Sequence, residues 1–330
     1  MRSWIWTADE KNARRASTYE SQRPASGLND HYVAAEQRHL FEVLDKKRLS
    51  EATRCPICTG VSKLIDTVNT INPNSKEVLD LRECRNCRHW WHDPLPRQEY
   101  LSSLYENASA FVVTKESLEI SQTTGELERM ATAILSSLHR GEGFNYLEIG
   151  VGSGQLFSIF KERAELCYGV EPGNWHEMDK NIVKDVDHLP KDIRFDVIVA
   201  YDVLEHLSSP VEMLKKLRKL ANHGAVIHCS FPNRDSLHAG LRRGKWSMIR
   251  PVGHLHYFSS KSVRRMFEGS GWILLDRRTV RPRNVSLKDA VRSLDLRTMD
   301  GPVMTMNLLL YRLLLSRDQW GIKGIAMNSD

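Results

Sequence analysis

The stretch that decides the fold is Leu147-Glu148-Ile149-Gly150-Val151-Gly152-Ser153-Gly154. It continues an apolar run typical of a buried strand and precedes a pattern typical of a helix. Glycines here let the backbone turn sharply and approach a ligand closely. The spacing is GxGxG, whereas the dinucleotide fingerprint has its third glycine one residue later, so the loop does not favour NAD. Glu148 disfavours a phosphate at the loop and favours a cationic amino group.

Acidic and polar side chains follow the next strands of the same segment. Glu171 ends the strand after the loop, where a carboxylate commonly bonds both ribose hydroxyls of a nucleoside. Asp185 and Val186 lie near the end of a third short strand, where an adenine could be held, and Tyr201 and Asp202 end a fourth. Ligands of doubly wound sheets bind outside the carboxyl ends of the strands. We therefore expect these residues to line one edge of a sheet.

Strand-like and helix-like runs alternate from residue 144 onward, which predicts a doubly wound parallel α/β sheet. The expected strands cover residues 146–150, 167–171, 195–201, 225–231 and 272–276. The expected helices between them cover residues 154–163, 210–221 and 259–269, after a longer helix over 118–139. The run GIKGIAM at 321–327 is expected to add an antiparallel edge strand.

Two CxxC pairs stand upstream, Cys55 with Cys58 and, 25 residues later, Cys84 with Cys87. Each pair can aim two thiolates at one ion from a tight turn, so together they predict a tetrahedral Zn–S₄ site. A closed site of four thiolates has no open coordination position, and its zinc would be structural rather than catalytic. A redox-active CxxC and a nucleic-acid-binding zinc ribbon are the alternatives.

In this order and spacing, LEIGVGSG, GVEPG, FDVIVAYDVLEHL and GHLHYFS resemble a class I S-adenosylmethionine-dependent methyltransferase over residues 118–276. The upstream segment CPIC…CRNCRHWWHDPLP…LYEN is similar to the zinc-binding N-terminal region of one methyltransferase subgroup. Members of that subgroup often methylate nucleotide-linked sugars or other small metabolites. The resemblance implies a Rossmann-like sheet of seven strands with an antiparallel last strand, preceded by a small zinc ribbon.

The resemblance also implies contacts with S-adenosylmethionine. The residues that would surround its methionine moiety are Glu148, Gly150, Gly152 and Gly154. Glu171 would bind the ribose hydroxyls, and Asp185 and Val186 would border the adenine. Tyr201 and Asp202 would line the site near the sulfonium.

Methyl transfer from a sulfonium is an in-line displacement, so most of the catalysis can come from positioning the acceptor. A hydroxyl, amine or activated-carbon acceptor also needs a base to remove a proton. His206 follows the fourth strand, and His254 and His256 alternate onto one face of a later segment. These three histidines are the candidate catalytic residues, and packing or capping is the alternative for each.

The composition limits the substrate class and the cellular location of the protein. With 47 Lys and Arg against 41 Asp and Glu, the net charge of +6 permits an anionic substrate but is too weak to indicate nucleic acid. Arginine clusters at 242–243 and 277–283 could hold a diphosphate, because guanidinium forks match phosphate oxygens. No apolar run reaches 18 residues, no signal-peptide pattern opens the chain, and six cysteines are too few for a disulfide scaffold. We therefore expect a cytoplasmic protein without a membrane span.

Three regions are expected: an arm and helix at 1–50, a zinc-binding region at 51–100, and a class I methyltransferase domain at 101–330. The last would contain a helical insertion at about 284–318. The expected function is methyl transfer to a small anionic metabolite, such as a nucleotide-linked sugar or glycan precursor, rather than to nucleic acid. The alternatives are a methyltransferase acting on RNA or protein and a non-catalytic, zinc-containing binding or scaffold protein.

Overall fold

The computed structural model describes residues 54–69, 78–96, 101, 124–138, 143–173, 179–249, 253–280 and 318–327. The arm and helix expected at 1–50 lie outside the described residues, as does the expected helical insertion up to residue 317. No helix in the described ranges is both long enough and apolar enough to cross a membrane.

The larger of two sheets has seven strands in the order β10-β11-β8-β7-β4-β5-β6. Its strands are, in chain order, β4 (Asn145–Ile149), β5 (Leu166–Val170), β6 (Ile182–Val183), β7 (Phe195–Tyr201), β8 (Ala221–Pro232), β10 (Trp272–Val280) and β11 (Gln319–Ala326). The first five are parallel, and β11 runs antiparallel to both β8 and β10. This is the expected seven-stranded sheet with an antiparallel last strand. The expectation that this last strand lies at the edge is wrong, because β11 lies between β8 and β10 and β10 forms the edge. The strand order reverses between β4 and β7, and such a switch point is where ligands bind.

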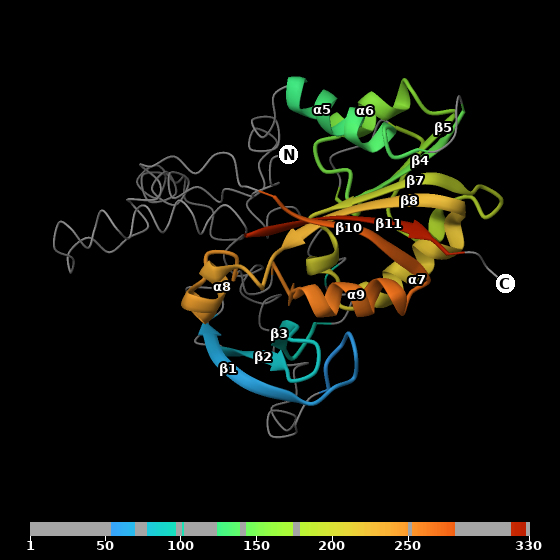
Figure 1. The fold of residues 1–330 in the computed structure, drawn as a ribbon. Coiled ribbons are helices and arrows are strands. Elements are labelled where there is room, and N and C mark those ends of the chain that lie inside the picture. The colour runs from blue at the N-terminus through green and yellow to red at the C-terminus, as the bar shows by residue number, and fades with distance from the viewer. Residues whose placement is uncertain are drawn as a thin grey trace, which may run out of the picture.

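Helices cover both faces of this sheet (Figure 1). One face carries α5 (Thr124–Leu135) and α6 (Gln155–Lys161), and the other carries α7 (Pro210–Leu220) and α9 (Ser260–Glu268). Successive residues of β7 alternate between the two cores, so that Val197 and Val199 pack toward α5 and α6 while Ile198 and Ala200 pack toward α7 and α9. Burial on both faces is why this strand is an uninterrupted apolar run.

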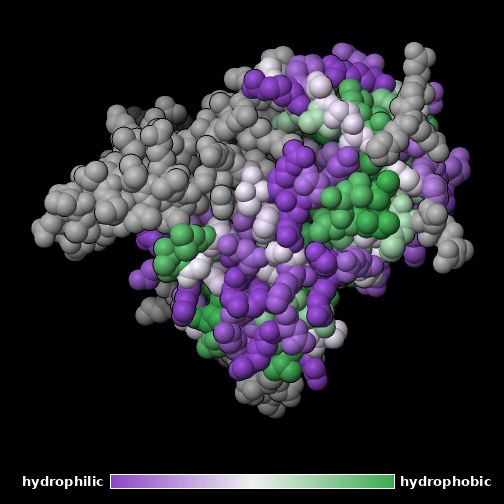
Figure 2. All heavy atoms as spheres, in the orientation of Figure 1, coloured by the Kyte–Doolittle hydropathy of each residue, from purple (hydrophilic) through white to green (hydrophobic). Residues whose placement is uncertain are grey.

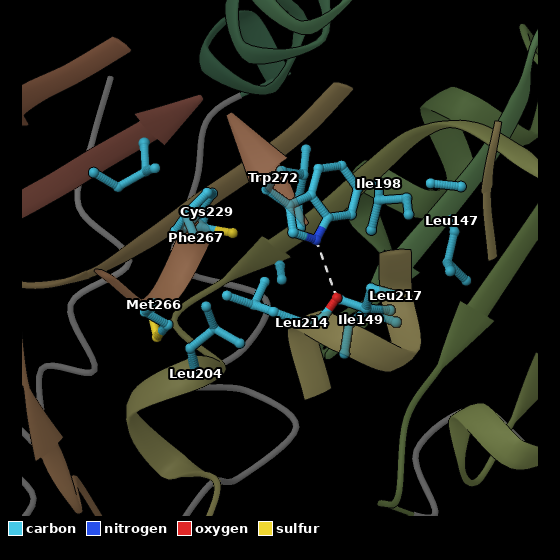
Figure 3. Packing of buried hydrophobic residues seen from close by; sticks show 14 of the residues in the cluster. Leu147, Ile149, Ile198, Leu204, Leu214, Leu217, Cys229, Met266, Phe267 and Trp272 are labelled. Carbon is cyan, nitrogen blue, oxygen red and sulfur yellow. Dashed lines mark hydrogen bonds between the residues drawn. The ribbon is translucent and has the colours of Figure 1, made fainter. Parts of the chain in front are cut away.

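The core on the α7 and α9 side surrounds Trp272, the first residue of β10 (Figure 3). The Trp272 ring packs among aliphatic and sulfur side chains, and its Nε1 donates a hydrogen bond to the Leu214 carbonyl at 3.0 Å. This bond satisfies the single polar atom of a fully buried side chain and ties β10 to α7.

A second sheet has four strands in the order β1-β2-β3-β9. The first three come from the cysteine-bearing segment: β1 (Ser62–Asn69), β2 (Val78–Cys84) and β3 (Trp90–Asp93). The fourth, β9 (His256–Tyr257), lies far along the chain and pairs antiparallel with β3. The cysteine-bearing region and the C-terminal part of the chain thus share one sheet, with α9 between the two sheets in Figure 1.

Candidate functional site

The loop between β4 and α6 is shaped by three glycines with positive φ, namely Gly150 at 72°, Gly152 at 54° and Gly154 at 75°. A Cβ on Gly150 would lie 2.6 Å from Val203 Cγ2, so packing as well as φ restricts this position to glycine. A Cβ on Gly152 would meet nothing nearer than 3.9 Å, so there the backbone conformation sets the requirement. The loop therefore turns sharply and offers bare backbone to the space in front of it.

Glu171 follows β5 and holds this loop. Its Oε2 accepts the Gly152 N–H at 2.9 Å, and its Oε1 accepts the Gly173 N–H at 2.8 Å. An ionised carboxylate offers about four acceptor positions, so each oxygen keeps one for a further donor. Two acceptors side by side at the end of a strand fit a pair of ligand hydroxyls, as a ribose presents.

Glu148, in β4, is only 3% exposed. Tyr146 donates its hydroxyl to Glu148 Oε2 at 3.0 Å. Burial raises the pKa of Glu148 to about 8, and the nearby charge of Glu171 acts in the same direction. A cation brought beside Glu148 would favour its ionised form, which fits the cationic amino group expected from the sequence.

Tyr201 and Asp202 lie at the carboxyl end of β7, next to β4 in the sheet. Asp202 adopts a φ of 53°, and its Oδ1 accepts hydrogen bonds from Ser230 Oγ and Gln319 Nε2, both at 2.9 Å. These contacts come from β8 and β11, so three strands fix the Asp202 carboxylate. Burial raises the pKa of Tyr201, which keeps its phenol neutral.

Asp185 and Val186 follow β6, as expected. Asp185 caps the short helix η4 (Val186–His188) by accepting the Asp187 N–H at 2.8 Å, and its side chain faces solvent. Val186 is buried in the core beside α7. The structure therefore brings the glycine loop, Glu171, Tyr201 and Asp202 to the switch point and sets this pair at the end of the outermost parallel strand.

His206 and His254 lie against each other, with ring centroids 4.9 Å apart and the rings edge to face. The Nδ1 of His206 bonds to the Gly253 carbonyl at 2.7 Å, and the Nδ1 of His254 bonds to the Met248 carbonyl at 2.8 Å. A carbonyl can only accept, so in each ring Nδ1 carries the hydrogen. In the neutral form, each Nε2 is then the basic nitrogen.

Glu205 completes a cluster that the sequence analysis missed. Ligand-type atoms of Glu205, His206 and His254 all lie within 4.8 Å of one another, with His206 Nε2 3.8 Å from Glu205 Oε1. Burial holds the pKa of the Glu205 carboxyl well above its usual range, and the charge of Asp202 adds to the effect. Its Oε2 has no hydrogen-bond partner among the residues that the structure describes. We call these three residues the Glu-His-His cluster; it can share a proton or hold a divalent cation.

His256, the third candidate histidine, is not part of this cluster. It is fully buried in β9, and its Nδ1 lies 3.0 Å from His89 Nε2. Burial lowers its pKa to about 4, so its ring is neutral at physiological pH. The alternating pattern predicted that His254 and His256 share one face and one site. The pairing of β9 with β3 instead places His256 beside His89.

The four cysteines converge as expected. The Sγ atoms of Cys55 and Cys87 are 3.6 Å apart, those of Cys58 and Cys84 are 3.5 Å apart, and all four lie within 4.8 Å. A tetrahedral Zn–S₄ centre with bonds of about 2.3 Å places its sulfurs about 3.8 Å apart. Backbone N–H groups point at Cys55 Sγ and Cys84 Sγ at 3.4 Å. The donor set and its geometry fit a zinc ion.

Comparisons with known proteins agree with this architecture. Residues 113–276 match a family model described as a methyltransferase domain. The chain is 28% identical over 140 residues to a tRNA U34 carboxymethyltransferase of Idiomarina loihiensis, an alignment that covers 37% of this chain and 43% of that protein. It is 26% identical over 143 residues to an uncharacterised protein of Methanocaldococcus jannaschii, which covers 42% of this chain and 68% of that one.

Among solved structures, an S-adenosylmethionine-dependent methyltransferase from Archaeoglobus fulgidus has 19% identity and a TM-score of 0.44. That superposition covers 68% of this chain and 98% of the other. The strand order and the glycine loop at the switch point define the class I methyltransferase fold. Residues 113–276 of this chain are accordingly an S-adenosylmethionine-dependent methyltransferase domain. The match spans less than half the length of that tRNA carboxymethyltransferase.

Proposed function

We propose that this protein transfers a methyl group from S-adenosylmethionine to a small anionic metabolite, such as a nucleotide-linked sugar or another glycan precursor. The observation that carries the proposal is the continuity of the site. The chain passes within four residues from Asp202, at the cofactor edge, to the buried Glu-His-His cluster. A methyl donor and a proton acceptor can therefore meet at one acceptor atom.

When bound, S-adenosylmethionine supplies an electrophilic methyl group on a sulfonium. In this proposal the ribose hydroxyls bond to Glu171, and the methionine moiety lies against the bare backbone of Gly150, Gly152 and Gly154. Glu148 ionises opposite the cationic amino group. Asp185 and Val186 border the adenine, and Tyr201 and Asp202 line the methyl-transfer side.

Proton removal falls to the Glu-His-His cluster. His254 Nε2 takes the proton from the acceptor, and its Nδ1–H bond to the Met248 carbonyl keeps the ring oriented before and after. His206 lies against the edge of this ring, and the buried Glu205 carboxyl lies within 4.8 Å of both histidines. His256 is assigned a positioning part, because it links β9 to His89 rather than to the cluster.

Cys55, Cys58, Cys84 and Cys87 hold one structural zinc ion in this proposal. The zinc-binding sheet supports the segment that carries His254. The His92 N–H bonds to the Leu255 carbonyl at 3.0 Å, and the Tyr257 hydroxyl bonds to the His254 carbonyl at 3.0 Å. A zinc ion held there would thus help to position His254 by keeping the backbone of this segment in place.

The proposed organisation keeps the regions at 1–50, 51–100 and 101–330. We place the protein in the cytoplasm, which the six cysteines support because all of them are thiols rather than disulfides. The partner is a small acceptor rather than a nucleic acid.

The tRNA-modifying relative favours a second candidate function, methylation of RNA. A phosphate-rich acceptor of this kind would bind with an affinity that falls steeply with salt. A small metabolite carrying one or two phosphates would show a much shallower dependence.

The test uses the full chain with S-adenosylmethionine labelled on its methyl group, offered either nucleotide-linked sugars or bulk tRNA. We expect label in the small-molecule fraction, and several-fold less of it with the Glu171→Ala variant when the cofactor is not saturating. Label only in the RNA fraction would move the assignment to the second candidate. Failure to bind S-adenosylmethionine at all would overturn both and favour a non-catalytic protein.

A further inference from the structure

A cavity of about 310 Å³ lies between the zinc-binding sheet and the segment that follows β8. That segment forms α8 (Leu237–Arg242) and the short helix η6 (Arg243–Lys245), and Figure 1 shows α8 beside the end of β1. The polar or aromatic residues lining the cavity are Lys63, Glu83, Arg88, Trp90, Arg234 and Arg243. Of these residues, only Arg243 belongs to an arginine cluster for which the sequence suggested a diphosphate.

The cavity has an excess of positive charge. Strand register places Lys63 opposite Glu83 and Glu83 opposite Trp90. Glu83 Oε1 accepts from Arg88 Nε at 2.6 Å and from Arg234 Nη2 at 2.7 Å, and Lys63 Nζ lies 3.1 Å from its Oε2. One carboxylate thus faces four lining cations.

Two acidic residues outside the lining also belong to this balance. Asp235 pairs with Arg234 Nη1 at 3.2 Å, and Asp66 accepts the Gly244 N–H at 3.0 Å. With both included, three carboxylates neutralise three of the four lining cations, so the cavity keeps a net positive charge.

Two buried donors at this cavity lack acceptors. Trp90 is 3% exposed and the Arg234 side chain is 10% exposed. Neither Trp90 Nε1 nor Arg234 Nε has a hydrogen-bond partner within the described ranges. The Arg234 guanidinium lies over the Trp90 ring at 4.6 Å, which fixes both groups together. Because these atoms can only donate, and a buried donor without a partner is costly, the cavity calls for an oxyanion acceptor.

The backbone at Arg243 supports the same conclusion. Arg243 adopts a φ of 48° and a ψ of −122°, a strained conformation for a residue with a side chain. The hydrogen bond from the following Gly244 N–H to Asp66 holds this turn against β1. Strain of this kind is typical of places where a ligand-binding side chain is held in position.

We propose that this cavity binds the phosphate or diphosphate group of the methyl acceptor. The identity of the ligand rests on the proposed function, whereas the anion site rests on the donors and charges alone. A cavity of about 310 Å³ with two buried donors fits one or two phosphates of a small molecule rather than the successive phosphates of an RNA strand. Arg234 and Trp90 bond to the oxyanion, and Lys63, Arg88 and Arg243 supply charge at the rim.

The test is calorimetric titration of the zinc-loaded full chain with inorganic pyrophosphate at fixed ionic strength. We expect saturable binding at one site. Trp90→Phe keeps an aromatic side chain but removes the N–H, and should weaken binding about tenfold, since a hydrogen bond to a charged group contributes about 1.5 kcal/mol or more. Arg243→Ala removes an exposed cation and should weaken binding by a smaller factor, about two- to fivefold. Lys245→Ala, at an exposed cation of the same short helix that does not line the cavity, should leave the affinity unchanged.

Equal weakening by Lys245→Ala, or no saturable binding of pyrophosphate by the unmodified chain, would overturn the proposal. Titration of the same samples with S-adenosylmethionine separates it from the proposed function. Pyrophosphate binding without cofactor binding would keep the anion site and reject the methyl transfer. Cofactor binding without pyrophosphate binding would keep the proposed methyl transfer and reject the anion site. Circular dichroism and zinc content show that each variant has folded.

Discussion

At the residue scale, the long-range contacts are what the sequence could not reveal. The expected edge residues follow the strands as predicted, because a parallel sheet brings strand ends together whatever their distance in sequence. Glu205 was not predicted as a site residue, because it joins the site only through its contact with His254, 49 residues later. Arg234 escaped for the same reason, because Trp90 and Glu83 reach it only through the packing of two sheets.

Glu148 should make the ligand-free protein lose stability as pH rises. Its folded pKa of about 8 exceeds its ordinary value of 4.5, so the folded state holds a proton that the unfolded state releases. Below pH 4.5 Glu148 is protonated in both states and does not change the free energy of unfolding. Between pH 4.5 and 8 it lowers the free energy of unfolding by at most about 1.4 kcal/mol per pH unit. Urea unfolding from pH 5 to 8 measures this slope. Glu148→Gln should flatten it, and an unchanged slope in that variant would reject the assignment.

Glu171→Ala should weaken S-adenosylmethionine binding by about tenfold or more. The variant removes acceptors for two ligand hydroxyls and the hold on Gly152 N–H. Calorimetry measures the dissociation constant, and a thermal melt reports the cost to the loop. Glu128→Ala, which removes a partly exposed carboxylate of α5 paired with Arg163, is the matched control. Unchanged affinity in Glu171→Ala would refute the ribose contact.

His254→Ala should lower the rate of methyl transfer by about 10²–10⁴, the usual contribution of a positioned general base, with little change in cofactor affinity. His256→Phe fills the same buried space without a basic nitrogen and should retain most of the rate. The reverse order of the two variants would move the base to His256. A second metal per chain that disappears in His254→Ala would instead make the Glu-His-His cluster a cation site.

At the scale of elements, the sequence was most informative where a strand is buried on both faces. Strand β7 has the expected bounds because its apolar run is uninterrupted. Strand β8 begins at Ala221, four residues before the expected start, because the polar residues Asn222 and His223 conceal it. The helix α8 was not predicted, since its Leu237 and Leu241 face solvent and form no buried stripe. Figure 2 shows a small hydrophobic patch over this helix. The two residues of β9 give no local signal for a partner as distant as β3.

At the scale of the whole molecule, the four-stranded sheet β1-β2-β3-β9 and the seven-stranded sheet meet around the segment that carries His254. Strand β9 belongs to the first sheet, and the bridge between Asn233 and Phe258 ties the following residues to the end of β8. The Ser259 hydroxyl reaches the Cys87 carbonyl. A zinc ion at the four cysteines should therefore affect the rate of methyl transfer by holding this segment in place. It should not affect cofactor binding, because β4 and β5 belong to the other sheet.

Cys84→Ser should lose the zinc and a large part of the stability of the cysteine-bearing region, because structural zinc contributes on the order of 10–16 kcal/mol in small peptides. We also expect methyl transfer to fall while S-adenosylmethionine binding persists. Elemental analysis, thermal melts and calorimetry measure the three effects. Cys167→Ser, at a buried cysteine outside the cluster, is the control that should keep its metal. A Cys84 variant that stays metal-loaded and equally stable would rule out the four-thiolate site.

The most direct test of the central claim is native mass spectrometry of the purified full chain, with and without S-adenosylmethionine. The structure and the proposal together predict one zinc ion per chain and one bound cofactor after addition. Zinc without cofactor, even at high cofactor concentration, would contradict the assignment as a methyltransferase and leave a zinc-containing binding protein in its place.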